Sequence, residues 1–178
     1  MKIPDFSLLS RNYLDYWNFP HPDGVRKLIG GEANDSDITN TCTIRLCHAM
    51  NASGFPIPRI WSRDPETQKP ITNRRGKNGK FYIIRVANMR TWMLHQFGKP
   101  DIDFKKKPGD PFDRSVIEGP EYEGVIAFEI GFRDATGHFD LWYKNKFSHE
   151  QSAGKDYFAL ASHISLWTTG LRTTLPHA

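Results

Sequence analysis

A cysteine stands at the start of an expected helix, and this placement constrains the chain more than any other feature of its sequence. The segment NTCTIRLCHAMN covers residues 40–51, and Cys42, Leu46, Ala49 and Met50 recur in it at the spacing of one helix face. The three residues before Cys42 are threonines and an asparagine, which are types that cap helix N-termini. The pattern therefore predicts that Cys42 falls in the first turn of a helix.

This position favours a reactive thiol. Backbone N–H groups without a partner and the positive end of the helix dipole both stabilise a thiolate there, and the same N–H groups can hold the oxyanion of a tetrahedral intermediate. Most free cysteines are nevertheless small buried hydrophobes, and for Cys42 the local sequence leaves both interpretations open. Cys47 lies in the middle of the same helix with nothing nearby to activate it, so we interpret it as a core residue.

A histidine far downstream supplies a possible partner for the thiol. Residues 124–130 (GVIAFEI) are typical of a buried strand, and a turn separates them from a second strand over 138–143. Alternation along the second strand puts His138, Asp140 and Trp142 on one face. A thiol at a helix start and an imidazole at the beginning of a strand are the two groups that a cysteine hydrolase needs.

The length of 178 residues suits one domain, and we expect a single catalytic domain over 1–178. Helical patterns come first and strand patterns follow, which predicts an α+β fold with a mostly antiparallel sheet. We expect a first helix over residues 6–17. The polar segments 59–80 and 99–121 are predicted to be long loops.

Charge and hydropathy narrow the function classes. The net charge of +4, from 24 basic and 20 acidic residues, is too small to indicate a nucleic-acid partner. No apolar run reaches membrane-spanning length, so we expect no membrane insertion. The first residues lack the pattern of a secretory signal, and we expect synthesis in the cytoplasm without a signal peptide. Two cysteines five positions apart on a helix point in different directions, which predicts no disulfide.

Several blocks of the sequence together resemble a known family. The chain is similar over most of its length to the family 4 amidase effectors of the type VI secretion system, an NlpC-type branch of the papain-like peptidoglycan hydrolases. The blocks that carry this resemblance are LIGGEA (28–33), NTCTIRLCHAMNASGFPIP (40–58), KFYIIRVANM (80–89), FGKPD (97–101), GVIAFEI (124–130), GHFDLW (137–142) and ISLW (164–167).

The resemblance implies a papain-like, NlpC-type fold with the catalytic cysteine at a helix N-terminus and an antiparallel sheet. It implies an antibacterial effector that the type VI secretion machinery delivers to the periplasm of a target bacterium. Such an enzyme hydrolyses the γ-D-glutamyl–meso-diaminopimelate bond of peptidoglycan stem peptides and so lyses the recipient, while a cognate periplasmic immunity protein protects the producer. The resemblance also implies Cys42 and His138 as the catalytic pair, with no metal and no organic cofactor.

Two residues are candidates for the third catalytic position, His149 and Asp140. The family usually has an aspartate eleven positions after the histidine, and this chain has His149 there. A neutral imidazole can accept a hydrogen bond and orient His138, so His149 is the preferred candidate. Asp140 is the alternative, but side chains at i and i+2 of a strand lie roughly 7 Å apart at Cβ, which makes a direct bond awkward. We therefore expect Asp140, like Trp142, to contact substrate or to support the site.

Other interpretations remain open at this point. For Arg45 we expect a structural salt bridge. The alternative functions are a housekeeping cell-wall cysteine peptidase, a non-catalytic cell-wall-binding module of the same fold, and a cysteine acyltransferase or deamidase. Metal binding through Cys42, Cys47 and His48 is disfavoured, because their spacing lacks a CxxC knuckle and a partner cluster.

Overall fold

The computed structural model describes residues 2–63, 70–131, 136–148 and 155–169. Within these residues the helices are α1 (Phe6–Asn12), α2 (Pro22–Ile29), α3 (Cys42–Ala52), α4 (Val86–Phe97) and α5 (Tyr157–Leu160), with short 3-10 turns at η1 (Gly31–Ala33) and η2 (Arg114–Ile117). The strands are β1 (Trp61–Arg63), β2 (Pro70–Arg75), β3 (Phe81–Ile83), β4 (Ile102–Lys105), β5 (Glu123–Glu129), β6 (Gly137–Tyr143), β7 (Lys146–Phe147) and β8 (His163–Thr168). None of the described helices is long and apolar enough to cross a membrane.

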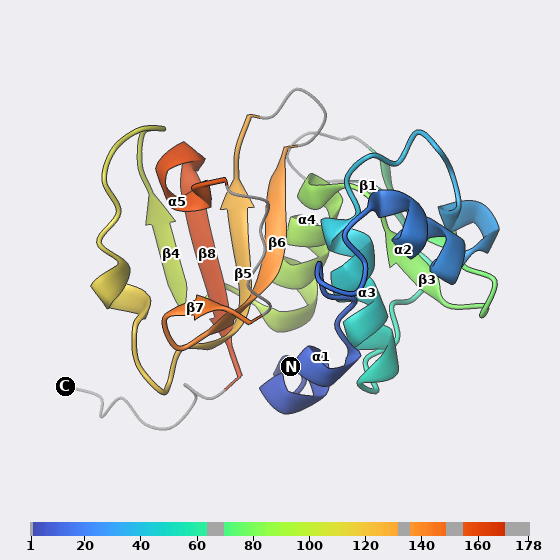
Figure 1. Ribbon diagram of the computed structural model, residues 1–178, viewed down its shortest axis with the longest axis horizontal. Helices are drawn as coiled ribbons and strands as arrows, with labels where there is room; N and C mark the ends of the chain where they lie inside the picture. Colours follow the sequence, from blue (N-terminus) through green and yellow to red (C-terminus); the bar gives the residue numbers. More distant parts are fainter. Residues whose placement is uncertain (1, 64–69, 132–135, 149–154, 170–178) are drawn as a thin grey trace.

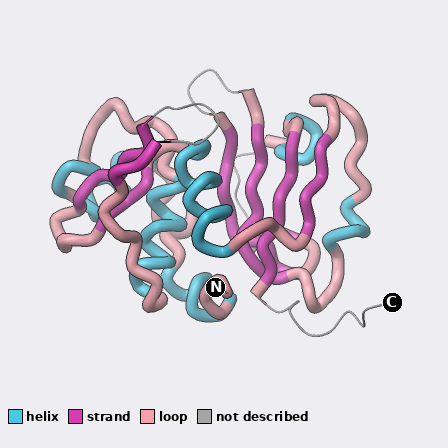
Figure 2. The backbone as a smooth tube through the Cα atoms, turned by 180° about the vertical axis from the view of Figure 1, so that it is seen from behind, coloured by secondary structure: helices cyan, strands magenta, loops and turns pink. Residues whose placement is uncertain are grey.

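The strands form two antiparallel sheets with helices between them. The larger sheet has the order β4-β8-β5-β6-β7, and the smaller has the order β1-β2-β3. Helices α3 and α4 contact β6 of the larger sheet and β3 of the smaller one (Figure 1). The view from behind shows the same three layers, which are the larger sheet, the helices and the smaller sheet (Figure 2). The predicted α+β class with an antiparallel sheet is confirmed.

The central strands β8, β5 and β6 of the larger sheet are buried on both faces, and their side chains alternate between these faces. On the face toward α3 and α4, Val125 and Ala127 of β5 pack with Phe139 and Leu141 of β6. The other face holds a second cluster, to which α5 and η2 contribute, and we call it the aromatic cluster after its four aromatic members, Phe128, Trp142, Tyr157 and Phe158. Its members are Ile117, Ile126, Phe128, Ile130, Trp142, Tyr157, Phe158, Ala161, Ile164 and Leu166.

Both predicted loops contain regular structure. Segment 59–80 holds β1 and the hairpin strand β2, and segment 99–121 holds β4 and η2. These strands were hidden by their polar composition: Asp103 of β4 is exposed, yet its carboxylate accepts a hydrogen bond from Ser165 on β8, 2.8 Å away. Pairing with a neighbouring strand outweighs local propensity at such edges.

The first helix is shorter than predicted, since it ends at Asn12 instead of residue 17. Downstream of it, the Asp15 carboxylate accepts a hydrogen bond from the Asn18 backbone N–H at 2.8 Å and closes a local turn. The carbonyl of Leu14 accepts a hydrogen bond from the buried Arg45 guanidinium of α3 at 2.6 Å. This bond and the turn replace the continuation of α1, and they bring Tyr16 to the start of α3.

Candidate active site

Cys42 is the first residue of α3, as predicted, and its side chain is only 1% exposed. Its backbone N–H donates a hydrogen bond to the side-chain oxygen Oδ1 of Asn40, 3.0 Å away. The amide nitrogen of Asn40 reaches the carbonyl of Gly137 at 3.4 Å. Asn40 therefore links the start of the cysteine helix to the start of β6.

His138 is the second residue of β6 and faces the aromatic side of the sheet, with an exposure of 3%. Its neighbour Gly137 has a φ of 152°, and a Cβ added there would stand 2.0 Å from the Phe128 carbonyl oxygen. Only glycine allows this close approach of β5 and β6. The register that pairs His138 with Phe128 therefore depends on the glycine before it.

Asp140 contacts His138 directly. Imidazole Nε2 donates a hydrogen bond to Asp140 Oδ2 at 3.3 Å, and Asp140 Oδ1 accepts the backbone N–H of Leu141 at 2.8 Å. The expectation that the i and i+2 spacing makes such a bond awkward was wrong. Strand side chains lean along the strand direction, and two leaning side chains span the gap between their Cβ atoms. Asp140 is fully buried, so water does not weaken this contact.

The His138 imidazole is held between two acidic groups. Burial alone lowers its pKa, but hydrogen bonds to Asp140 and to the Cys42 thiol, together with their charges, raise the pKa of His138 to about 9. Because Nε2 is engaged by Asp140, Nδ1 is the ring nitrogen that remains for the thiol. The ring is therefore protonated at neutral pH, and an imidazolium beside a cysteine stabilises the thiolate.

Tyr16 and Arg45 border the site, and sequence reasoning missed both roles. The centroid of the Tyr16 ring lies 6.2 Å from that of the His138 ring, and the Arg45 guanidinium stacks over the Tyr16 ring, 3.9 Å from its centroid. Arg45 is buried and donates to the carbonyls of Leu14, Asp15 and Phe19. The prediction of a salt bridge for Arg45 was wrong, because its guanidinium bonds backbone carbonyls and stacks on the Tyr16 ring.

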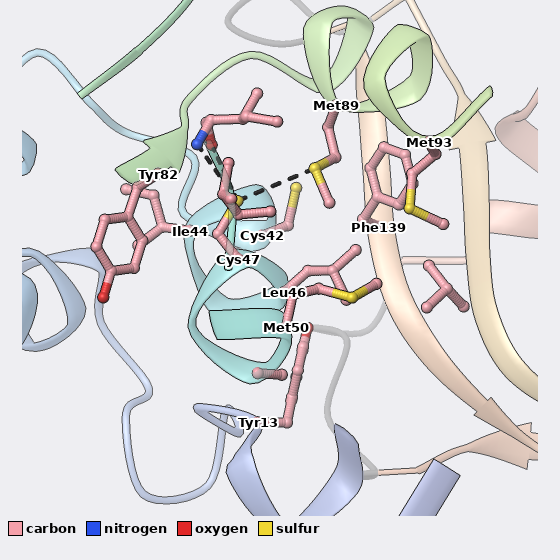
Figure 3. Packing of buried hydrophobic residues seen from close by; sticks show 14 of the residues in the cluster. Tyr13, Cys42, Ile44, Leu46, Cys47, Met50, Tyr82, Met89, Met93 and Phe139 are labelled. Carbon is pink, nitrogen blue, oxygen red and sulfur yellow. Dashed lines mark hydrogen bonds between the residues drawn. The ribbon is translucent and has the colours of Figure 1, made fainter. Parts of the chain in front are cut away.

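Cys47 has a different environment, which Figure 3 shows beside Cys42. Its sulfur accepts the Ile83 backbone N–H at 3.3 Å and lies 4.0 Å from the sulfur of Met89. Burial, the largest influence, raises the pKa of Cys47 to about 12. Both cysteines are free thiols, as predicted. In the described part of the chain, no three histidine, cysteine or acidic side chains are grouped as metal ligands would be.

The sequence predicted two further site residues, Trp142 and His149. Trp142 is 1% exposed, its indole N–H donates to the Ile117 carbonyl at 2.9 Å, and it packs edge-on against Phe147 and Phe158. Its polar atom and both flanks are used within the core, so the structure corrects the expectation that Trp142 contacts substrate. His149 lies outside the described residues, and its role as third catalytic residue stays a prediction.

Comparison with known proteins decides the family. Residues 38–167 match the family model described as type VI secretion system (T6SS), amidase effector protein 4, which covers more than half of the chain and includes Cys42, His138 and Asp140. The chain belongs to this family. The predicted resemblance is thereby confirmed, and with it the amidase activity of the chain as a type VI secretion effector.

Solved structures of family members have the same fold. The effector Tae4 from Salmonella typhimurium, in complex with the immunity protein Tai4 from Enterobacter cloacae, is 27% identical with a TM-score of 0.70, covering 93% of this chain and 98% of that one. Tae4 from Enterobacter cloacae, in an effector–immunity complex, is 26% identical with a TM-score of 0.71 over 93% of this chain and 98% of that one. No curated protein matches the sequence.

Proposed function

We propose that this family member is a cysteine amidase that hydrolyses the γ-D-glutamyl–meso-diaminopimelate bond of peptidoglycan stem peptides in the periplasm of a target bacterium. The observation that carries the proposal is the contact chain from Cys42 through His138 to Asp140 on a fold of this family. Because related effectors are seen with Tai4, the chain is further proposed to bind a cognate periplasmic immunity protein that blocks the active site.

The reaction begins with the ion pair. His138 is protonated at neutral pH and faces Cys42. We propose that the two react as a thiolate and an imidazolium, because a cation beside a cysteine favours the thiolate. The thiolate attacks the carbonyl carbon of the γ-glutamyl amide and forms a C–S bond. First-turn N–H groups of α3 other than that of Cys42, which is bonded to Asn40, stabilise the developing oxyanion, because the helix leaves them without intrahelical partners.

Collapse of the intermediate breaks the C–N bond. The imidazolium of His138 gives its proton to the leaving amine of diaminopimelate, and the neutral ring then accepts a proton from the water that attacks the thioester. This second step breaks the C–S bond, releases the glutamyl acid, which ionises in water, and restores the thiolate–imidazolium pair. Asp140 orients the ring through Nε2 and stabilises its charged form, which is the role that sequence reasoning assigned to His149.

The decisive experiment is mass spectrometry of purified sacculi after incubation with the protein and with Cys42→Ala. We expect the active protein to release fragments in which one water has been added across the glutamyl–diaminopimelate bond, and we expect none from the variant. Sacculi that keep intact stems with the active protein would contradict the proposal.

The same spectra separate the rival activities. A deamidase would release ammonia and leave the stem length unchanged, an acyltransferase would attach a new group to the stem, and a binding module would sediment with sacculi without changing their mass. A cut at another bond would leave the amidase class standing and correct the proposed substrate bond.

A further inference from the structure

A tyrosine lies flat against the histidine of the site. The rings of Tyr157 and His138 have centroids 4.2 Å apart and planes that differ by only 3°. Tyr157 is the first residue of α5, and Asp156 caps this short helix by accepting the Ala159 N–H at 3.2 Å. The helix start thus places the ring over β6 from the side of the sheet that is opposite to α4.

The tyrosine ring is itself held in place by the aromatic cluster. Phe128, the strand partner of His138, stacks on Tyr157 with centroids 5.5 Å apart, and Phe147 meets it edge-on at 6.2 Å. Burial, followed by the charges of Cys42 and Asp140, raises the pKa of Tyr157 to about 12. The ring therefore stays neutral in the pH range in which His138 is charged.

This geometry has two consequences for an imidazole. A parallel ring at van der Waals distance prevents rotation of the imidazole out of its plane, and that plane contains both the nitrogen bonded to Asp140 and the one that faces Cys42. The electron-rich face of an aromatic ring also attracts a cation, and the attraction is greatest where water is excluded. Both effects favour the protonated, correctly turned form of His138.

We propose that Tyr157 is a positioning residue for His138, which fixes the plane of the ring between Asp140 and Cys42 and stabilises the imidazolium. The inference rests on the roles proposed above for Cys42 and His138. A residue of α5 thereby joins the groups of α3 and β6 that stabilise the Cys42 thiolate.

The alternative is that Tyr157 only fills space in the aromatic cluster. The next residue supplies a matched control: Phe158 is equally buried on the same short helix and stacks with Phe112 and edge-on with Trp142. Among the described ring contacts, Phe158 has none with His138. Loss of packing is therefore common to both positions, and contact with the imidazole belongs to Tyr157.

The test measures thiol reactivity, which does not depend on the identity of the substrate. The rate at which iodoacetamide modifies Cys42 is followed by mass spectrometry from acidic to alkaline pH in the wild type, Tyr157→Phe, Tyr157→Leu and Phe158→Leu. Cys47, which is fully buried and contacts Ile83 and Met89, is the internal reference in each protein. The groups that face His138 in this titration are Cys42, Asp140, Tyr16 and Tyr157, with Arg45 behind Tyr16.

We expect Tyr157→Leu to move the midpoint of the Cys42 profile upward by about one pH unit, since loss of the stacked face destabilises the imidazolium. On peptidoglycan fragments, kcat should fall by roughly tenfold to a hundredfold with a smaller change in KM. Tyr157→Phe keeps the stacked ring and should have the midpoint and the kcat of the wild type. Phe158→Leu should lower the melting temperature and leave the midpoint in place.

An unchanged midpoint in a folded Tyr157→Leu protein, or an equal shift in Phe158→Leu, would overturn the inference. If Tyr157→Leu does not fold, the wild type still decides: a stacked tyrosine shifts the His138 Cε1 proton upfield in the NMR spectrum, and an unshifted resonance would refute the contact. Failure of the proposed substrate would leave the alkylation profiles unaffected, so the two ideas fail separately.

Discussion

The two cysteines of α3 have the same burial and opposite surroundings. Cys42 at the start of the helix is 1% exposed and Cys47, five residues on, is 0% exposed. Cys42 faces the His138–Asp140 pair, whereas Cys47 meets the Ile83 backbone and the Met89 sulfur. Burial raises the pKa of Cys47 to about 12, and the same burial at Cys42 is accompanied by an imidazole whose pKa is about 9.

The difference shows that low exposure does not decide whether a thiol is inert. Burying a thiolate costs free energy when no charge or donor faces it. A buried imidazolium beside the thiolate offsets this cost, because the attraction between the two charges is weakly screened. Position on the helix adds to this, since the dipole acts within the first turn and fades beyond it. We therefore propose that α3 holds both the nucleophile, Cys42, and a structural thiol, Cys47.

The largest expected effect tests this contrast on activity. Cys42→Ala should reduce hydrolysis of sacculi by at least roughly 10⁴-fold, because the covalent route is lost. Cys47→Ala should retain hydrolysis, as its sulfur faces only the core. Release of soluble fragments from labelled sacculi measures both variants. Comparable losses in the two would mean that the helix position does not distinguish the thiols.

The second prediction removes the carboxylate behind the imidazole. Asp140→Asn should lower kcat by roughly 10²–10⁴-fold. His138 acts as an acid only while protonated, so wild-type activity should fall as the pH rises through about 9. Without the negative charge the pKa of His138 falls, and this alkaline limb should move to lower pH by roughly one to three units.

The pH–rate profile on stem peptides gives both numbers. The groups facing the ring, namely Cys42, Tyr16 and Tyr157, are unchanged in Asp140→Asn, so a shift reports the carboxylate. His149→Ala is the companion variant. A profile altered by His149→Ala and untouched by Asp140→Asn would return the orienting role to His149.

Much of this site was visible in the sequence because its main groups have local signatures. The cap-like residues and the helical spacing placed Cys42, and strand alternation placed His138 and Asp140 on one face. The His138–Asp140 bond was missed, because Cβ spacing says nothing of how far two side chains lean toward each other. The register between β5 and β6 depends on Gly137, and the need for a glycine there appears only once the two strands are paired.

The residues around the pair could not be predicted for a different reason. Tyr16 precedes α3 by a bent segment, and Tyr157 follows β6 on a helix of four residues. Both reach His138 through packing of distant segments, and neither carries a local pattern that points to an imidazole. Arg45 was assigned a carboxylate partner, but the chain around Leu14 offers it carbonyls instead.

The third prediction concerns stability, for which we expect Cys47 to matter more than Cys42. Cys47→Ser buries a hydroxyl among apolar groups, and its shorter C–O bond draws the acceptor away from the Ile83 N–H. The change should cost about 1–3 kcal/mol of unfolding free energy. Cys42→Ser should unfold at nearly the wild-type temperature, because His138 can bond the hydroxyl. Thermal unfolding by circular dichroism compares them, and a larger loss in Cys42→Ser would contradict the assignment.

The smallest effect distinguishes the two ends of α3 through a matched pair of asparagines. Asn40 accepts the Cys42 N–H and reaches Gly137, while Asn51 at the far end donates to the Phe81 carbonyl at 3.0 Å and accepts the Ile57 N–H at 2.8 Å. Each Asn→Ala change should cost about 1 kcal/mol of stability. Only Asn40→Ala should also lower kcat, by roughly fivefold to tenfold, because it frees the helix start and β6 to shift relative to each other. Equal kcat values for the two variants, at equal loss of stability, would show that the helix start holds Cys42 in place without Asn40.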